Sequence, residues 1–136
     1  MDDKNNGEIP KNNEQAKPVI EPEKISVNDT YHFDNGEFSG NVYKTSEELG
    51  FLALEVLVHG NHERTRMLKG TTRTYYVIEG EGTFTIGDTV HEVKKGDLYV
   101  IPAGGEYEYQ GNMKLLEINI SPTNEINEEP VKKGIE

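Results

Sequence analysis

Hydrophobic and polar residues alternate in short runs along the middle of the chain, and few runs have the spacing of a helix. The runs "TFTI" and "TVHEV" flank Gly87-Asp88, which predicts a β-hairpin with a two-residue turn. "KTSEELGF" predicts one helical turn that ends at Gly50. We expect strands at Thr30–Phe33, Asn41–Tyr43, Phe51–His59, Arg73–Glu79, Thr83–Ile86, Val90–Val93, Leu98–Ile101, Glu106–Gln110 and Lys114–Ile120.

Turn-forming residues separate these runs at short intervals. "EGEG", "KKGD", "PAGGE" and "QGNM" are rich in Gly, Pro and polar residues, and "EGEG" is interpreted as a hairpin turn. Short strands that follow one another this closely are typical of an all-β sandwich or barrel. The sequence therefore predicts an all-β fold.

The two ends of the chain lack the alternating pattern. Residues 1–24 and 121–136 are rich in Asn, Glu, Lys and Pro and contain few apolar residues. Such segments cannot bury enough surface to offset the entropy lost on ordering. We therefore predict a disordered acidic segment at 1–24, one β-barrel domain at 25–120 and a disordered tail at 121–136. A domain of this size supports one core, and we expect a homodimer formed through an exposed barrel edge.

Composition narrows the possible partners and compartments. The net charge is −11 at pH 7, which disfavours binding to nucleic acids and to anionic membranes. The chain has no cysteine, so it has neither disulfides nor thiolate metal sites. No signal peptide is visible and no apolar run is long enough to span a bilayer. These features predict a cytoplasmic protein.

Two frames of glycine and proline carry a resemblance to a known family. The first runs from Gly60 to Gly80, and the second runs through Gly96, Pro102 and Gly104 as far as residue 111. Both frames resemble the two motifs of the cupin superfamily, the cupin type-2 or RmlC-like barrels. The resemblance implies a small double-stranded β-helix, or jelly-roll, with its motifs at residues 60–111.

The residues at the metal-ligand positions of these motifs depart from the family. Arg66, Leu68, Arg73 and Tyr107 stand where the motifs have His, His, Glu and His. Arginine has no lone pair to offer a metal, and leucine has no donor atom. We therefore predict no metal at these positions and no cofactor, so the usual metal-dependent activities of the family lose their support.

The same positions suggest a different kind of site. If the cupin frame holds, Arg66 and Arg73 point into the barrel mouth, with Tyr75 and Tyr107 beside them. An arginine fork suits a carboxylate or phosphate, and a tyrosine can stack on a sugar ring. Glu117 shares its strand face with Leu115 and Asn119 and is expected to face inward. We predict that these five residues bind a small anionic or sugar-like ligand without a metal: Arg66, Arg73, Tyr75, Tyr107 and Glu117.

Three alternatives stay open at this point. Either arginine could instead pair with Glu55 or Glu117 and simply fill the barrel, which would leave a structural protein. The barrel could be a sugar isomerase or epimerase with Tyr107 and Glu117 as the acid–base pair, although no histidine base is expected in it.

The third alternative is a displaced metal site. His59 and His62 lie three residues apart in "HGNHE", and Glu63 could add a third ligand. This spacing on a glycine-containing loop would make the protein a metal-dependent cupin. Whether the protein is an enzyme is left open by the sequence.

Overall fold

The computed structural model describes residues 21–122 and 125–131, so the disorder expected for residues 1–20 and 132–136 falls outside the described residues. The regular secondary structure of the described residues is almost entirely β, as the alternation predicted. The elements are η1 (Val27–Asp29), β2 (Tyr31–Asp34), β3 (Phe38–Tyr43), η2 (Glu47–Leu49), β4 (Phe51–Val58), β5 (Asn61–Met67), β6 (Thr72–Ile86), β7 (Thr89–Lys94), β8 (Leu98–Ile101), β9 (Glu106–Ile120) and β10 (Glu128–Pro130).

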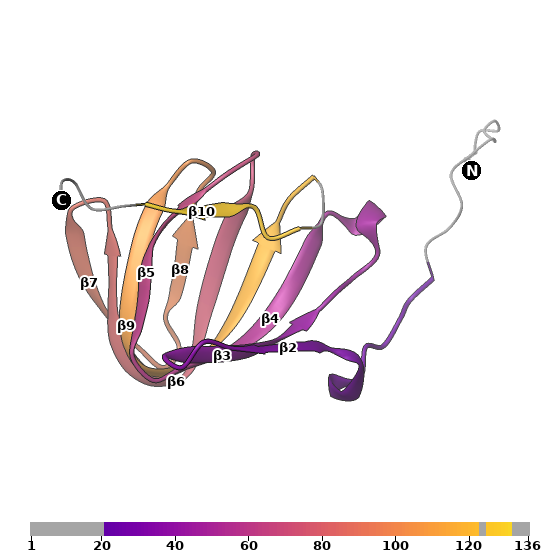
Figure 1. Ribbon diagram of the computed structural model, residues 1–136, viewed down its shortest axis with the longest axis horizontal. Coiled ribbons are helices and arrows are strands. Elements are labelled where there is room, and N and C mark those ends of the chain that lie inside the picture. Colours follow the sequence, from indigo (N-terminus) through magenta and orange to yellow (C-terminus); the bar gives the residue numbers. More distant parts are fainter. Residues whose placement is uncertain (1–20, 123–124, 132–136) are drawn as a thin grey trace, which may run out of the picture.

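The strands form one antiparallel sheet that curls around itself. One path through the sheet runs β10-β5-β9-β4-β3-β2, and β6 joins β9 while also pairing with β7 and β8. The curl brings β10 across one side of the barrel, opposite β2 and β3 (Figure 1). This architecture is the all-β jelly-roll that the sequence predicted. Within residues 21–122 and 125–131, no helix is both long and apolar enough to cross a membrane.

The longest strands, β6 and β9, bend where the sequence predicted turns. "EGEG" and "QGNM" do not end a strand: residues 81–86 and 107–112 continue the pairing of β6 with β9. Gly80 has φ 88°, and its backbone lies so close to β9 that an added Cβ would be 2.1 Å from the carbonyl oxygen of Asn112. Glycine at this position therefore lets the two strands bend together without losing their hydrogen bonds. The expected hairpin turn at "EGEG" is wrong for this reason.

Two strands escaped the sequence prediction because they are polar. β5 reads "NHERTRM", and its buried residues are His62, Thr65 and Met67, so it has no apolar alternation. A register shift between His62 and Thr65 disturbs the period further. β10 is only three residues long and pairs with residues 65–67 of β5. Residues 125–131 are therefore not a disordered tail, which corrects that prediction for this part of 121–136.

The core fills one half of the barrel. Four rings pack on one another there, and all are at most 2% exposed: Tyr75, Phe84, Tyr107 and Tyr109. The other half is lined by Phe33 of β2, Val42 of β3 and Leu54 of β4 but is not filled. This half holds the cavity described next.

Candidate functional site

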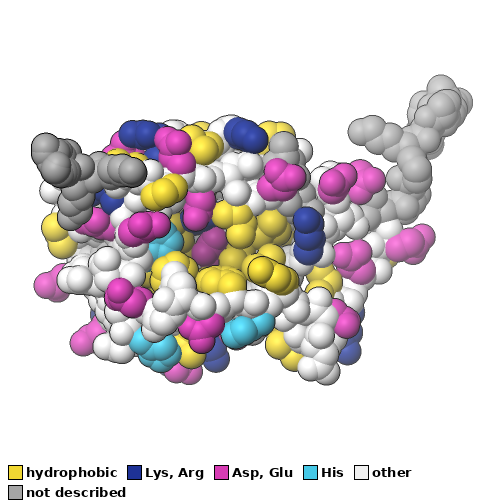
Figure 2. All heavy atoms as spheres, viewed as in Figure 1, with side chains coloured by type: hydrophobic (Ala, Val, Ile, Leu, Met, Phe, Trp, Pro, Cys, Tyr) yellow, Lys and Arg dark blue, Asp and Glu magenta, His cyan; other side chains and the backbone are white. Residues whose placement is uncertain are grey.

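A cavity of about 700 Å³ opens into the barrel. Its mouth is visible in Figure 2 as a hollow with hydrophobic side chains in its floor and acidic and histidine side chains around it. Its apolar walls come from Tyr31, Phe33, Phe38, Val42, Leu52, Leu54 and Ile126. Its polar end consists of His62, Arg73, Glu117 and Glu128. The volume suits a small organic molecule.

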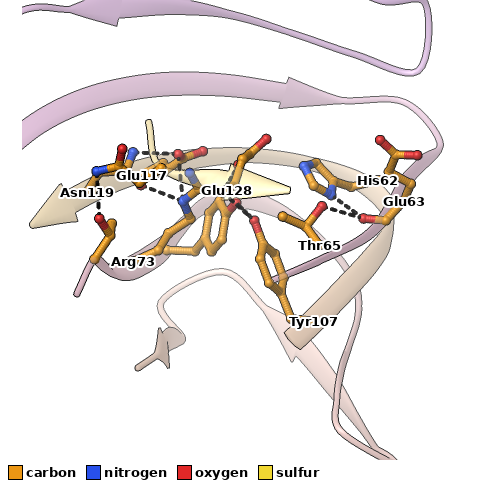
Figure 3. A network of polar contacts seen from close by, with 11 residues as sticks. His62, Glu63, Thr65, Arg73, Tyr107, Glu117, Asn119 and Glu128 are labelled. Carbon is orange, nitrogen blue, oxygen red and sulfur yellow. Dashed lines mark hydrogen bonds and ion pairs between the residues drawn. The ribbon is translucent and has the colours of Figure 1, made fainter. Parts of the chain in front are cut away.

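Arg73 is the centre of the polar end. It comes from β6 and is 1% exposed. Its Nε donates to Oδ1 of Asn119 at 2.6 Å and lies 3.1 Å from Oε2 of Glu117. Asn119 donates in turn to Glu117 at 2.8 Å, so the three side chains hold one another in place (Figure 3). The alternative that Arg73 pairs with Glu117 is confirmed.

A second carboxylate reaches Arg73 from the C-terminal segment. Nη1 of Arg73 donates to Oε1 of Glu128 at 2.6 Å and to the hydroxyl of Tyr107 at 2.7 Å. Nη2 is buried and has no hydrogen-bond acceptor among the described residues. A buried donor without an acceptor is costly, so this atom calls for an ordered water or an acceptor atom of a ligand. Glu128 was missed because it lies in a segment that reads as a tail.

Tyr75 and Tyr107 do not line the cavity, in contrast to the prediction. They lie behind Arg73 in the core, where their hydroxyls are 2.5 Å apart. Burial raises the pKa of the Tyr107 hydroxyl, although Arg73 opposes this shift. The rings that do face the cavity come from Tyr31, Phe33 and Phe38, on strands outside the two cupin motifs.

Arg66 also lies elsewhere. Its side chain is 40% exposed and makes ion pairs with Glu106 and with Glu129, the latter at 2.8 Å. It does not line the cavity, so the expectation of two arginines in the barrel mouth is wrong. The reason is the alternation of β5: Thr65 and Met67 are buried, so Arg66 points outward. Glu55 pairs with Lys114 rather than with either arginine.

His62 lies inside the barrel, a position that the sequence did not predict. Its ring is 6% exposed and packs against Phe38, Tyr107 and Tyr109. Nδ1 lies 2.8 Å from the carbonyl oxygen of Glu63, which can only accept, so Nδ1 carries the proton. The other ring nitrogen, Nε2, faces the side on which Glu128 lies (Figure 3). A neutral His62 therefore offers a lone pair at Nε2.

The displaced metal site is not formed. His59 is exposed whereas His62 is buried in the barrel, so the two rings do not meet. Within residues 21–122 and 125–131, no group of three His, Asp or Glu side chains is arranged to hold a metal ion. At the cupin ligand positions, Arg73 and Tyr107 hydrogen-bond to each other and Arg66 points outward. The residues present at those positions do not fit a metal.

Acid should destabilise the protein through His62. Burial lowers the pKa of His62, and the nearby carboxylate of Glu128 offsets this only in part. The unfolded chain therefore takes up this proton near pH 6.5, before the folded protein does. As the pH falls below about 6.5, His62 should cost up to about 1.4 kcal/mol of unfolding free energy per pH unit. Urea unfolding of His62→Phe between pH 5 and 7.5 should show a correspondingly flatter pH dependence.

His59→Phe, at an exposed position before the same strand, controls for the change of residue type. Parallel stability curves for the wild type and His62→Phe would contradict the burial of a neutral His62.

Comparisons with known proteins agree with this architecture. Residues 54–118 match the family described as Cupin domain. A variant of Streptomyces Pac13 solved with uridine superposes with a TM-score of 0.73 at 20% identity, over 83% of this chain and 93% of that chain. Pac13 is described as a nucleoside dehydratase. No curated protein sequence gives a significant match.

Two further structures share the fold. Ectoine synthase from P. lautus has a TM-score of 0.60 at 19% identity, over 77% of this chain and 83% of that chain. Oxalate decarboxylase from Bacillus subtilis has a TM-score of 0.71 at 17% identity, over 88% of this chain but 34% of that longer chain. Identities this low concern the fold alone. By its family match and its fold, this chain belongs to the cupin superfamily.

Proposed function

We propose that this protein binds a small, neutral molecule that combines a ring with hydroxyl groups, such as a nucleoside or a sugar. The observation that carries this proposal is the make-up of the cavity, whose apolar and aromatic walls lead to a polar end. A ring fits against Phe33, Phe38 and Tyr31, and hydroxyl groups reach the carboxylates of Glu117 and Glu128.

The charges of the lining favour a neutral ligand over an anionic one. Acidic side chains of the lining are Asp29, Glu117, Glu125 and Glu128, whereas its basic side chains are Lys44 and Arg73. Arg73 already pairs with two carboxylates, so its charge is not available to a ligand anion. Ionised carboxylates accept hydrogen bonds, which hydroxyl and amide groups of a ligand donate. Of the two predicted ligand classes, we therefore favour the sugar-like one.

Two further observations support this class. Nη2 of Arg73 lacks an acceptor within the described residues, and a carbonyl or hydroxyl oxygen of a ligand would supply one once the side chains around it shift. Pac13 was solved with uridine, a neutral molecule with a ring, hydroxyl groups and carbonyl oxygens. At 20% identity that similarity supports a ligand class and no particular compound.

An enzyme is the second candidate, because His62 supplies a base that was not expected. The pair Tyr107 and Glu117 is a poor acid–base pair, since burial raises the pKa of Tyr107 and the hydroxyl does not reach the cavity. His62 lines the cavity with an unprotonated Nε2 and lies near Glu128. Such a histidine can accept a proton from a bound ligand near neutral pH.

Uridine and uridine 5′-monophosphate make a suitable pair of probes, because they differ only in the charged phosphate. We expect isothermal titration calorimetry to show tighter binding of uridine than of the monophosphate. Glu128→Gln should weaken uridine binding by about tenfold or more, since a hydrogen bond to a charged acceptor contributes about 1.5–3 kcal/mol. Glu129→Gln is the matched control: it is the next residue of β10, but its side chain pairs with Arg66 outside the cavity.

Tighter binding of the monophosphate would overturn the choice of a neutral ligand and restore the anionic one. Equal losses in Glu128→Gln and Glu129→Gln would place the ligand outside the cavity. Mass spectrometry of uridine recovered after incubation separates the two candidates, because an enzyme returns an altered compound and a binding protein returns uridine.

A further inference from the structure

A second hollow, lined mostly by polar side chains, lies next to the cavity. Its volume is about 430 Å³, and we call it the polar pocket. Four residues line both hollows: Asn35, Phe38, His62 and Glu128. Glu37, Asn61 and Glu63 complete the lining of the polar pocket. The two hollows therefore share a wall, so a group in the polar pocket lies directly beside a molecule in the cavity.

The charged side chains of the polar pocket are all acidic. Glu37, Glu63 and Glu128 each bring a carboxylate, and none of the described residues that line the pocket is a lysine or an arginine. Glu128 has a cationic partner in Arg73. Glu37 and Glu63, in contrast, make no ion pair with any described residue. The polar pocket thus holds negative charge that the described part of the protein does not neutralise.

His62 gives the polar pocket an acceptor that lacks a donor. Its side chain is only 6% exposed, and its Nδ1 proton is bound by the carbonyl oxygen of Glu63. Nε2 keeps its lone pair, and none of the described residues donates a hydrogen bond to it. The ring lies between Glu63 and Glu128 (Figure 3). A buried acceptor of this kind calls for a donor from a bound molecule or an ordered water.

Hydrogen bonds from the backbone hold the carboxylate of Glu37 in place. Its Oε1 accepts from the N–H of Asn61 at 2.7 Å, and its own carbonyl oxygen accepts from the N–H of His59 at 2.7 Å. Oδ1 of Asn35 accepts from the N–H groups of Glu37 and Phe38 at 3.2 and 3.0 Å, which fixes the preceding turn. A cation that binds Glu37 therefore finds the charge already positioned, so little side-chain entropy is lost on binding.

We propose that the polar pocket binds a protonated primary amine. The carboxylates and Nε2 of His62 all accept hydrogen bonds, whereas an ammonium group brings three N–H donors and a positive charge. A hydroxyl group would satisfy an acceptor but would leave Glu37 and Glu63 without a counter-charge. A metal ion fits less well, since no group of three His, Asp or Glu side chains within the described residues is arranged to hold one.

The amine has two possible sources. Attached to the ligand of the cavity, it reaches the polar pocket past the shared wall at His62, and in that case the inference rests on the proposed function. As a separate small molecule, it binds beside a neutral ligand. In both cases the cavity itself takes an uncharged ring with hydroxyl groups, and the positive charge lies among Glu37, Glu63 and Glu128.

The 3′-amino-3′-deoxy and 5′-amino-5′-deoxy analogues of uridine test the attached amine, because each replaces one hydroxyl by an amine that is mostly protonated at pH 7. We expect isothermal titration calorimetry to show at least one analogue binding about tenfold or more tightly than uridine. Acetylation of its amine, which removes the charge, should abolish this gain. Glu37→Gln and Glu63→Gln should each reduce the gain, whereas Glu92→Gln, at an exposed position on β7, should keep it.

Ethanolamine, titrated with and without uridine, tests the free amine. Ethanolamine binding that weakens in Glu37→Gln but not in Glu92→Gln would assign the polar pocket to a separate molecule, even if uridine itself does not bind. A gain for the analogues without ethanolamine binding would assign it to a substituent of the ligand. The proposal is overturned if neither effect is found, or if Glu37→Gln and Glu63→Gln leave both effects as large as Glu92→Gln does.

Discussion

Replacing Arg73 with methionine is expected to lower the free energy of unfolding by about 3–5 kcal/mol, measured by urea denaturation at pH 7. The guanidinium is 1% exposed and is paired with Glu117 and Glu128, so its removal leaves two carboxylates without their cation. One of them, Glu117, is itself buried and would keep the hydrogen bond from Asn119. Methionine fills much of the same volume, so the loss reflects charge rather than a cavity.

Arg66→Met is the matched control, because it removes the same charge from the outside of the barrel. Its ion pairs are partly exposed, so we expect a loss of no more than about 1 kcal/mol. The double variant Arg73→Met/Glu117→Gln should recover part of the loss, since it removes one unpaired buried charge. Similar losses for Arg73→Met and Arg66→Met, or no recovery in the double variant, would contradict a buried ion network.

The second large effect is expected at a glycine of the first cupin motif. Gly80→Ala should cost about 3 kcal/mol or more, because two penalties add. A positive φ costs about 1–2 kcal/mol in any residue with a Cβ, and overpacking against rigid atoms typically costs about 1–3 kcal/mol more. Here the Cβ would meet the backbone of Asn112 and Met113, neither of which can swing away as a side chain would.

Gly104→Ala separates the two penalties. Gly104 belongs to the second motif and has nearly the same φ, 82° against 88°, but an added Cβ would find nothing within 4 Å. Its alanine variant should therefore cost only the conformational penalty of about 1–2 kcal/mol. Equal losses at Gly80 and Gly104 in urea unfolding would show that β6 and β9 are free to separate at the bend.

The sequence was most informative where residues alternate strictly. The inward position of Glu117, on one strand face with Leu115 and Asn119, followed from the period of β9. The predicted strand ends near Gly80 and Gly111 were wrong, because glycine there bends a continuous strand instead of ending it. The alternation also gave no sign of β5, whose inward residues are mostly polar.

The sequence predicted only some of the residues of the candidate site. The cupin frame placed Arg73 correctly, but it also placed Arg66 inward, since it assumes ligand positions at a fixed spacing and β5 presents Thr65 instead. Glu128 and Phe38 come from segments outside the motifs, and only the tertiary fold brings them to Arg73 and His62. That Arg73 and Glu117 contact a ligand stays a prediction.

The position of β10 bears on how this barrel could change over evolution. The segment 125–131 contributes Glu125, Ile126 and Glu128 to the cavity wall, yet it adds none of the large residues of the aromatic core. Substitutions in Glu125 and Ile126 can therefore reshape the wall while the packing of β4, β6 and β9 stays intact. Mutations in this short segment can therefore change which ligand the protein prefers without preventing the chain from folding. Relatives that share this barrel but differ in these last residues should differ first in what they accept.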